Sequence, residues 1–243
     1  MAKNQESTVL EPLSRLVSVM KDVFAGDLAS VILYGSAARG AYRRGVSDLN
    51  ILILLEKSYP RRIFLFGKKA GRLIRRFRIT PLIMSVPEFQ GSADVFPMEY
   101  ADMAEARRVL HGPDPAFPAL TRTNLRHQLE ERLRGAVNDL RQMLIAAEGR
   151  ERALGRFLRN WSGVPNAIFR GLAGLRGAAA ARDPGETLVF VAREYGIPTD
   201  AFTDLGRLRG GESIPPGDLA GRLLEALKAL AAAVDAMPDG EDR

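Results

Sequence analysis

The chain has 243 residues, of which 46% are hydrophobic, so it can form one large domain or two smaller ones with apolar cores. It has no cysteine and two histidines, which excludes disulfides and thiolate or histidine-rich metal sites and leaves oxygen ligands, suited to Mg²⁺ or Mn²⁺. The N-terminus has no apolar signal segment, and no apolar run approaches the roughly 18 residues of a membrane span. We therefore expect a cytoplasmic protein without membrane contact.

The first half of the chain alternates between helical and strand patterns. The predicted helices are residues 8–24, 36–42, 63–77 and 87–94. The predicted strands are residues 30–34, 49–55, 80–85, 96–103 and 108–110. The run at 49–55 is apolar except for Asn50, which predicts a strand covered on both faces.

Prolines and a glycine between residues 112 and 118 interrupt this pattern, and beyond them only helical patterns follow. The predicted helices of this second half are residues 125–147, 152–175 with an interruption near Pro165, 186–195 and 219–237. We therefore predict an α+β protein with two domains. Residues 1–118 would form a small mixed β-sheet with flanking helices, and residues 119–243 would form an α-helical bundle.

A phosphate site is predicted where the first strand ends. The apolar run of this strand stops at Gly35 and Ser36. Glycine can adopt backbone angles that other residues avoid, and serine can begin and cap a short helix. The free N–H groups at the start of a helix bind anions, phosphate above all. Arg39, one helical turn after Ser36, could add a phosphate contact.

A metal site is predicted at the start of the next strand. Eleven residues separate Ser36 from Asp48, which precedes the apolar strand 49–55. Because side chains alternate along a strand, Asp48 and Asn50 share one face. A carboxylate and an amide oxygen are both acceptable ligands of Mg²⁺.

These two segments together resemble the active-site signature of the nucleotidyltransferase superfamily, which includes DNA polymerase beta and the aminoglycoside nucleotidyltransferases. The resemblance implies that Gly35 and Ser36 hold the phosphates of a nucleoside triphosphate and that Asp48 binds the metal bridging them. In the family a third carboxylate lies on a later strand and acts as a base or metal ligand. Glu99 matches that position best, and it is the predicted second catalytic carboxylate. Asp102 would fall on the opposite face of the same strand.

Asn50 departs from the family pattern, which has a second carboxylate at this position. A neutral amide compensates less of the charge of two metal ions. Three interpretations stay open: an enzyme with one firmly bound metal, a protein that binds nucleotide without turnover, and a fold retained for contact with a partner protein.

The resemblance implies transfer of a nucleoside monophosphate from a Mg²⁺–nucleoside triphosphate complex to a hydroxyl of an unknown small-molecule or protein acceptor. The alternative is a catalytically degenerate module that binds a nucleotide or a partner in regulation. The oligomeric state is open, and a homodimer is compatible with the sequence.

Nucleic-acid binding through a basic helix at residues 61–78 is a weaker alternative. Nine basic residues and no acidic residue lie between Lys57 and Arg78, within a chain of formal net charge +6. Such a run either binds a polyanion or forms a solvated helix face. Phe64, Phe66 and Phe77 fit the apolar stripe of this helix, so we expect no exposed aromatic rings for stacking against bases.

Overall fold

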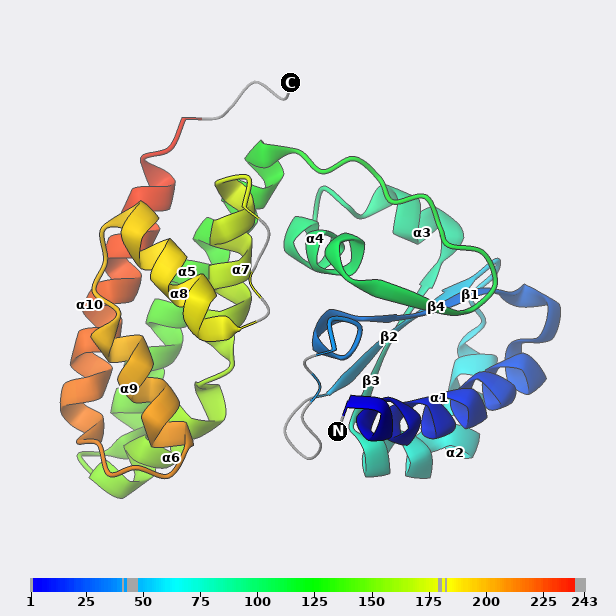
Figure 1. Ribbon diagram of the computed structural model, residues 1–243, viewed down its shortest axis with the longest axis horizontal. Helices are drawn as coiled ribbons and strands as arrows, with labels where there is room; N and C mark the ends of the chain where they lie inside the picture. The colour runs from blue at the N-terminus through cyan, green and yellow to red at the C-terminus, as the bar shows by residue number, and fades with distance from the viewer. Residues whose placement is uncertain (1, 41, 43–47, 179–180, 182, 239–243) are drawn as a thin grey trace. The chain divides into compact units, whose positions relative to one another are not determined.

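The computed structural model describes residues 2–40, 42, 48–178, 181 and 183–238 (Figure 1). The chain divides into two compact units. The first unit is Met1–Asp94 with Glu99–Ala119, and the second is Val95–Met98 with Leu120–Arg243. The first unit is built on a mixed sheet and the second is helical, so the fold class is α+β, as predicted.

The first unit contains a four-stranded sheet in the order β3-β2-β1-β4. The strands are β1 (Leu28–Tyr34), β2 (Leu49–Leu55), β3 (Ile79–Ser85) and β4 (Arg107–His111). β1 is antiparallel to both β2 and β4, whereas β2 and β3 are parallel. At the end of β1, Tyr34 lies opposite Asn50, and Asn50 lies beside Thr80 of β3.

Helices cover both faces of this sheet (Figure 1). They are α1 (Ala2–Phe24), α2 (Pro60–Phe77), α3 (Val86–Gly91) and α4 (Pro97–Glu105). On one face, Ile53 of β2 packs in a core with Phe66 of α2 and residues of α1. On the other face, Leu52 of β2 packs in a core with Phe89 of α3 and residues of α4. The prediction that β2 is covered on both faces is therefore confirmed.

The prediction of a strand at residues 96–103 is wrong, because these residues lie in α4. Pro97 begins the helix, a position that tolerates proline since the first N–H has no intrahelical partner. The buried residues Pro97, Tyr100 and Met103 recur at intervals of three, which is helical spacing. Glu99 and Asp102 are also three residues apart, so they lie on neighbouring positions of one helix surface rather than on opposite faces.

The turn after β1 is shorter than predicted. It forms a 3-10 helix, η2 (Gly35–Ala37), one of two such turns with η1 (Ala25–Asp27) in the described part of the chain. The predicted helix at residues 36–42 therefore ends early. Residues 41 and 43–47, which include Arg43 and Arg44, lie outside the described residues.

The second unit is a bundle of helices around one apolar core. They are α5 (Arg122–Ala147), α6 (Glu151–Trp161), α7 (Val164–Leu175), α8 (Pro184–Tyr195), α9 (Asp200–Arg209) and α10 (Pro216–Asp235). Helix α9, which was not predicted, is short and buries Phe202, Leu205 and Leu208 at three-residue intervals. None of the helices in the described part of the chain is both long and apolar enough to cross a membrane.

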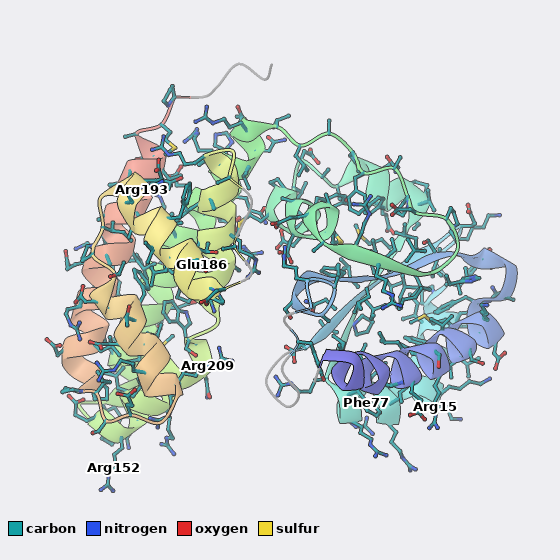
Figure 2. The ribbon with its side chains drawn as sticks, in the orientation of Figure 1. Arg15, Phe77, Arg152, Glu186, Arg193 and Arg209 are labelled. Carbon is teal, nitrogen blue, oxygen red and sulfur yellow. The ribbon has the colours of Figure 1, made fainter. Side chains whose placement is uncertain are left out.

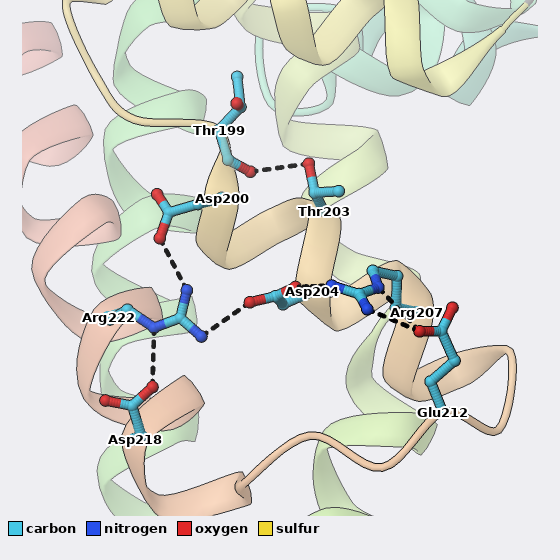
Figure 3. A network of polar contacts seen from close by, with 8 residues as sticks. All are labelled: Thr199, Asp200, Thr203, Asp204, Arg207, Glu212, Asp218 and Arg222. Atoms are coloured by element: carbon cyan, nitrogen blue, oxygen red, sulfur yellow. Dashed lines mark hydrogen bonds and ion pairs between the residues drawn. The ribbon is translucent and has the colours of Figure 1, made fainter.

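One arginine joins the last two helices. Arg222 of α10 donates hydrogen bonds to Asp218 on its own helix and to Asp200 and Asp204 on α9, at 2.9, 2.7 and 2.9 Å (Figure 3). Asp204 also accepts a hydrogen bond from Arg207 at 3.0 Å. The planar guanidinium suits this arrangement, since it directs several N–H groups at fixed angles.

Candidate active site

Gly35 forms the centre of the turn between β1 and η2. Its φ angle is +75°, in the left-handed region that favours glycine. A Cβ atom at this position would lie 3.0 Å from Nδ2 of Asn50 and 3.5 Å from Oδ2 of Asp102. The N–H of Gly35 donates to the carbonyl of Ala106 at 3.3 Å, which fixes the turn against the end of α4. A side chain at position 35 would therefore both strain the backbone and fill the space between Asn50 and Asp102.

The residues after Gly35 offer hydrogen-bond donors. The first N–H groups of a helix have no intrahelical acceptor, so those of Ser36 and Ala37 are suited to bind an anion. The N–H of Arg39 is used within the turn, where it donates to the carbonyl of Gly35 at 3.1 Å. Donors suitable for phosphate therefore lie beside the space that the absent Cβ of Gly35 leaves.

Arg39 is held by two carboxylates of α4. Its guanidinium donates to Asp102 at 2.7 Å and to Glu105 at 2.8 Å, and its side chain is only 11% exposed. Burial opposes the charge of this guanidinium, but Asp102 and Glu105 outweigh it and raise the pKa of Arg39 above its ordinary value. Its Nε is buried and has no hydrogen-bond partner among the described residues. Arg39 thus retains one buried N–H donor that no described residue accepts from.

Asp48 lies directly before β2 and is paired with Arg78. Nε of Arg78 donates to Oδ1 of Asp48 at 2.7 Å, and the two side chains are 53% and 48% exposed. Arg78 ends α2 in a left-handed conformation with φ of 51°, which turns the chain directly into β3. An ion pair this exposed contributes about 0–1 kcal/mol, so a divalent cation can compete with Arg78 for Asp48.

The third carboxylate of the family pattern is absent from the strands. β3 (Ile79–Ser85) and β4 (Arg107–His111) contain no aspartate or glutamate. Thr80 occupies the position of β3 beside Asn50. The expectation that Glu99 lies on a strand is therefore wrong, and two neutral residues, Asn50 and Thr80, stand side by side at this end of the sheet.

Two carboxylates of α4 nevertheless reach the end of β1. Burial, followed by the negative charges of Asp102 and Glu99, raises the pKa of Tyr34 to about 12. Tyr34 therefore keeps its proton at neutral pH and can donate a hydrogen bond. Of the two carboxylates, Asp102 lies against Gly35, whereas the sequence pattern favoured Glu99. The signal that could have identified Asp102 is Pro97, whose position at the start of a helix changes which side chains share a face.

The donor set fits a nucleotide better than it fits two metal ions. The N–H groups of Ser36 and Ala37, which follow Gly35, suit an anion such as a triphosphate. Asp48 and Asn50 offer one carboxylate and one amide oxygen, which suit a single Mg²⁺ that keeps ligands from water and phosphate. No three histidines, aspartates or glutamates gather as a metal-binding group in the described part of the chain.

A family model described as a nucleotidyltransferase domain matches residues 13–103. Residues 13–103 belong to the nucleotidyltransferase superfamily. All six residues predicted for the site lie within this nucleotidyltransferase domain: Gly35, Ser36, Arg39, Asp48, Asn50 and Glu99. Their individual roles remain predictions.

A solved structure shares the fold beyond the nucleotidyltransferase domain. The crystal structure of spectinomycin adenyltransferase AAD(9) from Enterococcus faecialis with ATP and spectinomycin aligns over 90% of this chain and 99% of its own. The TM-score is 0.59 and the sequence identity 10%, so the match shows a shared fold alone. No curated protein sequence matches the chain.

Proposed function

We propose that this protein binds a Mg²⁺–nucleoside triphosphate complex and transfers the nucleoside monophosphate to a hydroxyl of an acceptor, with release of pyrophosphate. The observation that carries this proposal is the Gly35 turn. It combines a positive φ, the N–H groups that begin η2 and a space that a Cβ would fill. This turn lies within the nucleotidyltransferase domain.

In this proposal the residues of the turn bind and orient the triphosphate. The N–H groups of Ser36 and Ala37 donate to phosphate oxygens, and the guanidinium of Arg39 offsets their negative charge. Asp48 and Asn50 hold the Mg²⁺, which supplies charge neutralisation when bound. Catalysis then rests on positioning and electrostatic stabilisation rather than on a covalent protein intermediate.

We assign the position of the third carboxylate to Asp102 rather than to Glu99. Oδ2 of Asp102 lies against the Gly35 turn, while Oδ1 accepts a hydrogen bond from Arg39. A carboxylate held in this way can accept the proton of an acceptor hydroxyl or offset the charge of a metal. Glu99 lies one helical turn earlier on α4 and contributes to the field at Tyr34.

The second candidate function is nucleotide binding without turnover. It is favoured by the two neutral residues at the end of the sheet, Asn50 and Thr80, where neither β3 nor β4 supplies a carboxylate. A site with less negative charge holds a second metal ion weakly. The two candidates share the Gly35 turn and differ in pyrophosphate release.

The deciding experiment is calorimetric titration with each nucleoside triphosphate, with and without Mg²⁺, followed by an assay of pyrophosphate release. Spectinomycin and related hydroxyl-bearing compounds are the first acceptors to test, because the structurally similar AAD(9) was crystallised with ATP and spectinomycin. Asp48→Asn should abolish Mg²⁺-dependent nucleotide binding. Asp22→Asn on the exposed surface of α1 removes the same charge and should have no effect.

Nucleotide binding without pyrophosphate release, across a broad panel of hydroxyl acceptors, would favour the second candidate. Both candidates fail if no nucleoside triphosphate binds, or if Asp48→Asn binds the Mg²⁺ complex as tightly as the wild type.

A further inference from the structure

Helix α2 exposes a row of basic side chains on the surface directed away from its core. Phe66 and Ala70 are the buried residues of this helix. The exposed basic residues, which we call the basic row, are Arg61, Lys68, Lys69, Arg72, Arg75 and Arg76. They recur at intervals of three and four residues and so follow one side of the helix. Figure 2 shows long nitrogen-tipped side chains extending from α2 near the labelled Phe77.

The charge of the basic row is not compensated within the described part of the chain, where no ion pair involves any of its six members. Two other arginines of the same segment differ, since Arg62 pairs with Asp27 and Arg78 pairs with Asp48. In the helical unit, Arg222 contacts three aspartates. The positive field of the basic row is therefore available to an external anion.

An exposed aromatic ring accompanies the basic row. Phe64 is 79% exposed, so the prediction that it belongs to the core stripe is wrong. It lies three residues after Arg61 and four before Lys68, which places it among the charges on the helix surface. Tyr59, just before the helix, is 44% exposed, and Leu65 is 39% exposed. The objection that this helix lacks exposed aromatic rings is therefore removed.

We propose that this face of α2 binds single-stranded nucleic acid. The row extends over roughly 22 Å from Arg61 to Arg76, at a rise of about 1.5 Å per residue, and so matches a linear chain of phosphates. Phe64 offers a ring on which an unpaired base can stack, and every base has such a face. The surface recognises phosphate and ring, without donors arranged to read a base edge. We expect binding that is independent of sequence and of the proposed transferase activity.

Two other polyanions fit this surface less well. In a duplex the bases are stacked on each other, so Phe64 has no ring to contact. An anionic membrane is bound through buried apolar area as well as charge, and most of the apolar stripe of α2 is used in the protein core. Only Phe64 and Leu65 remain on the outer surface of α2 as large exposed apolar side chains.

The first test measures the binding of labelled single strands of about 12 nucleotides to the full chain by fluorescence anisotropy. The test variant replaces Lys68, Lys69, Arg72 and Arg75 with glutamine. The control variant removes the same charge from the exposed Arg152, Arg156, Arg159 and Arg209 of the helical unit, two of which Figure 2 labels. We expect the test variant to bind about a hundredfold more weakly at low salt, with a slope of log affinity against log salt that is shallower by about 3.

The second test isolates stacking at Phe64. Phe64→Ala should weaken binding between about fivefold and a hundredfold, and Phe64→Tyr should bind like the wild type. Phe64→Leu keeps an apolar side chain but loses the ring, so it should weaken binding as alanine does. These exposed substitutions leave the core intact, and circular dichroism checks the fold of each variant.

Several outcomes would overturn the proposal. One is no binding of single strands at about 50 mM salt, and another is equal loss in the test and control variants. Equal affinity for duplex or for inorganic polyphosphate, together with unchanged affinity of Phe64→Ala, would reduce the surface to a general polyanion site. Tighter binding to vesicles of phosphatidylserine, with Phe64→Leu as active as the wild type, would assign it to membranes instead.

Discussion

At the scale of single residues, Gly35 and Gly40 have nearly the same backbone conformation, with φ angles of +75° and +74°. A side chain at either position costs about 1–2 kcal/mol in backbone strain. Only Gly35 has described neighbours within 4 Å of a Cβ, namely Asn50 and Asp102. We therefore expect Gly35→Ala to weaken nucleoside triphosphate binding at least about tenfold, or 1.4 kcal/mol, and Gly40→Ala to leave it unchanged. Calorimetric titration of both folded variants tests this, and equal affinities would contradict the assigned phosphate site.

In the proposed site, Arg78 would compete with Mg²⁺ for Asp48. Since both side chains are about half exposed, their ion pair contributes up to about 1 kcal/mol. Arg78→Gln should therefore tighten Mg²⁺ binding by up to about fivefold, as measured by titration in the presence of nucleotide. Arg62→Gln removes an equal charge from the pair with Asp27 and serves as the control. Tighter binding in both variants would indicate a general effect of net charge.

Asn50 is neutral, so the proposed metal site carries less negative charge than a carboxylate at this position would give it. Asn50→Asp would place a second carboxylate near Asp48 and should tighten Mg²⁺ binding about tenfold or more, since unit charges about 4 Å apart interact by about 4 kcal/mol near a protein surface. If the protein is a weakened enzyme, pyrophosphate release should also rise. If it is adapted to asparagine, release should fall while metal binding improves. Unchanged metal affinity would show that residue 50 does not face the metal.

At the scale of elements, the aspartates around Arg222 hold α9 against α10 (Figure 3). The hydrogen bond from Arg222 lowers the pKa of Asp204 below its ordinary value. A carboxyl with a lowered pKa in the folded state stabilises the protein above its unfolded pKa of about 3.9, and that stabilisation is lost as the pH falls through the folded value.

We therefore expect Arg222→Gln to lower the melting temperature at pH 7 and the difference from the wild type to shrink as the pH falls below about 4. Lys228→Gln, which removes a single exposed ion pair with Glu225, should have a smaller effect at pH 7. Thermal unfolding of the three proteins across this pH range provides the measurement. A difference that stays constant with pH would mean that the charges of the aspartates contribute nothing.

At the scale of the whole molecule, the cores are separate. Two apolar clusters lie in the sheet-containing unit, and a third lies among helices α5 to α10. Because each core is enclosed by its own unit, we expect two unfolding transitions in calorimetry. A nucleotide that binds at Gly35 should stabilise only the sheet-containing unit and so raise only the transition temperature of that unit. The free energy of unfolding of this unit should rise by about 2.7 kcal/mol at a nucleotide concentration one hundred times the dissociation constant. A single transition would contradict this expectation.

The sequence by itself determined the elements and the turn. Strands β1, β2 and β3 and most helices follow from local periodicity. Gly35 and Ser36 mark the turn because the conformational preference of a turn depends on only a few neighbouring residues. The nine basic residues and the absence of acidic residues at 57–78 are likewise a local feature of the sequence. The superfamily was recognisable for the same reason, since its motif occupies two short segments.

Only the tertiary structure decided which side chains meet. Asp102 approaches Gly35 because residues 97–105 form a helix rather than a strand, which moves Asp102 to the side of Tyr34. Periodicity could not settle this, because short apolar runs fit either element until packing selects one. The exposure of Phe64 was decided in the same way, since only part of the apolar pattern of α2 reaches the core. Contacts across long sequence separations depend on packing, which local patterns do not encode.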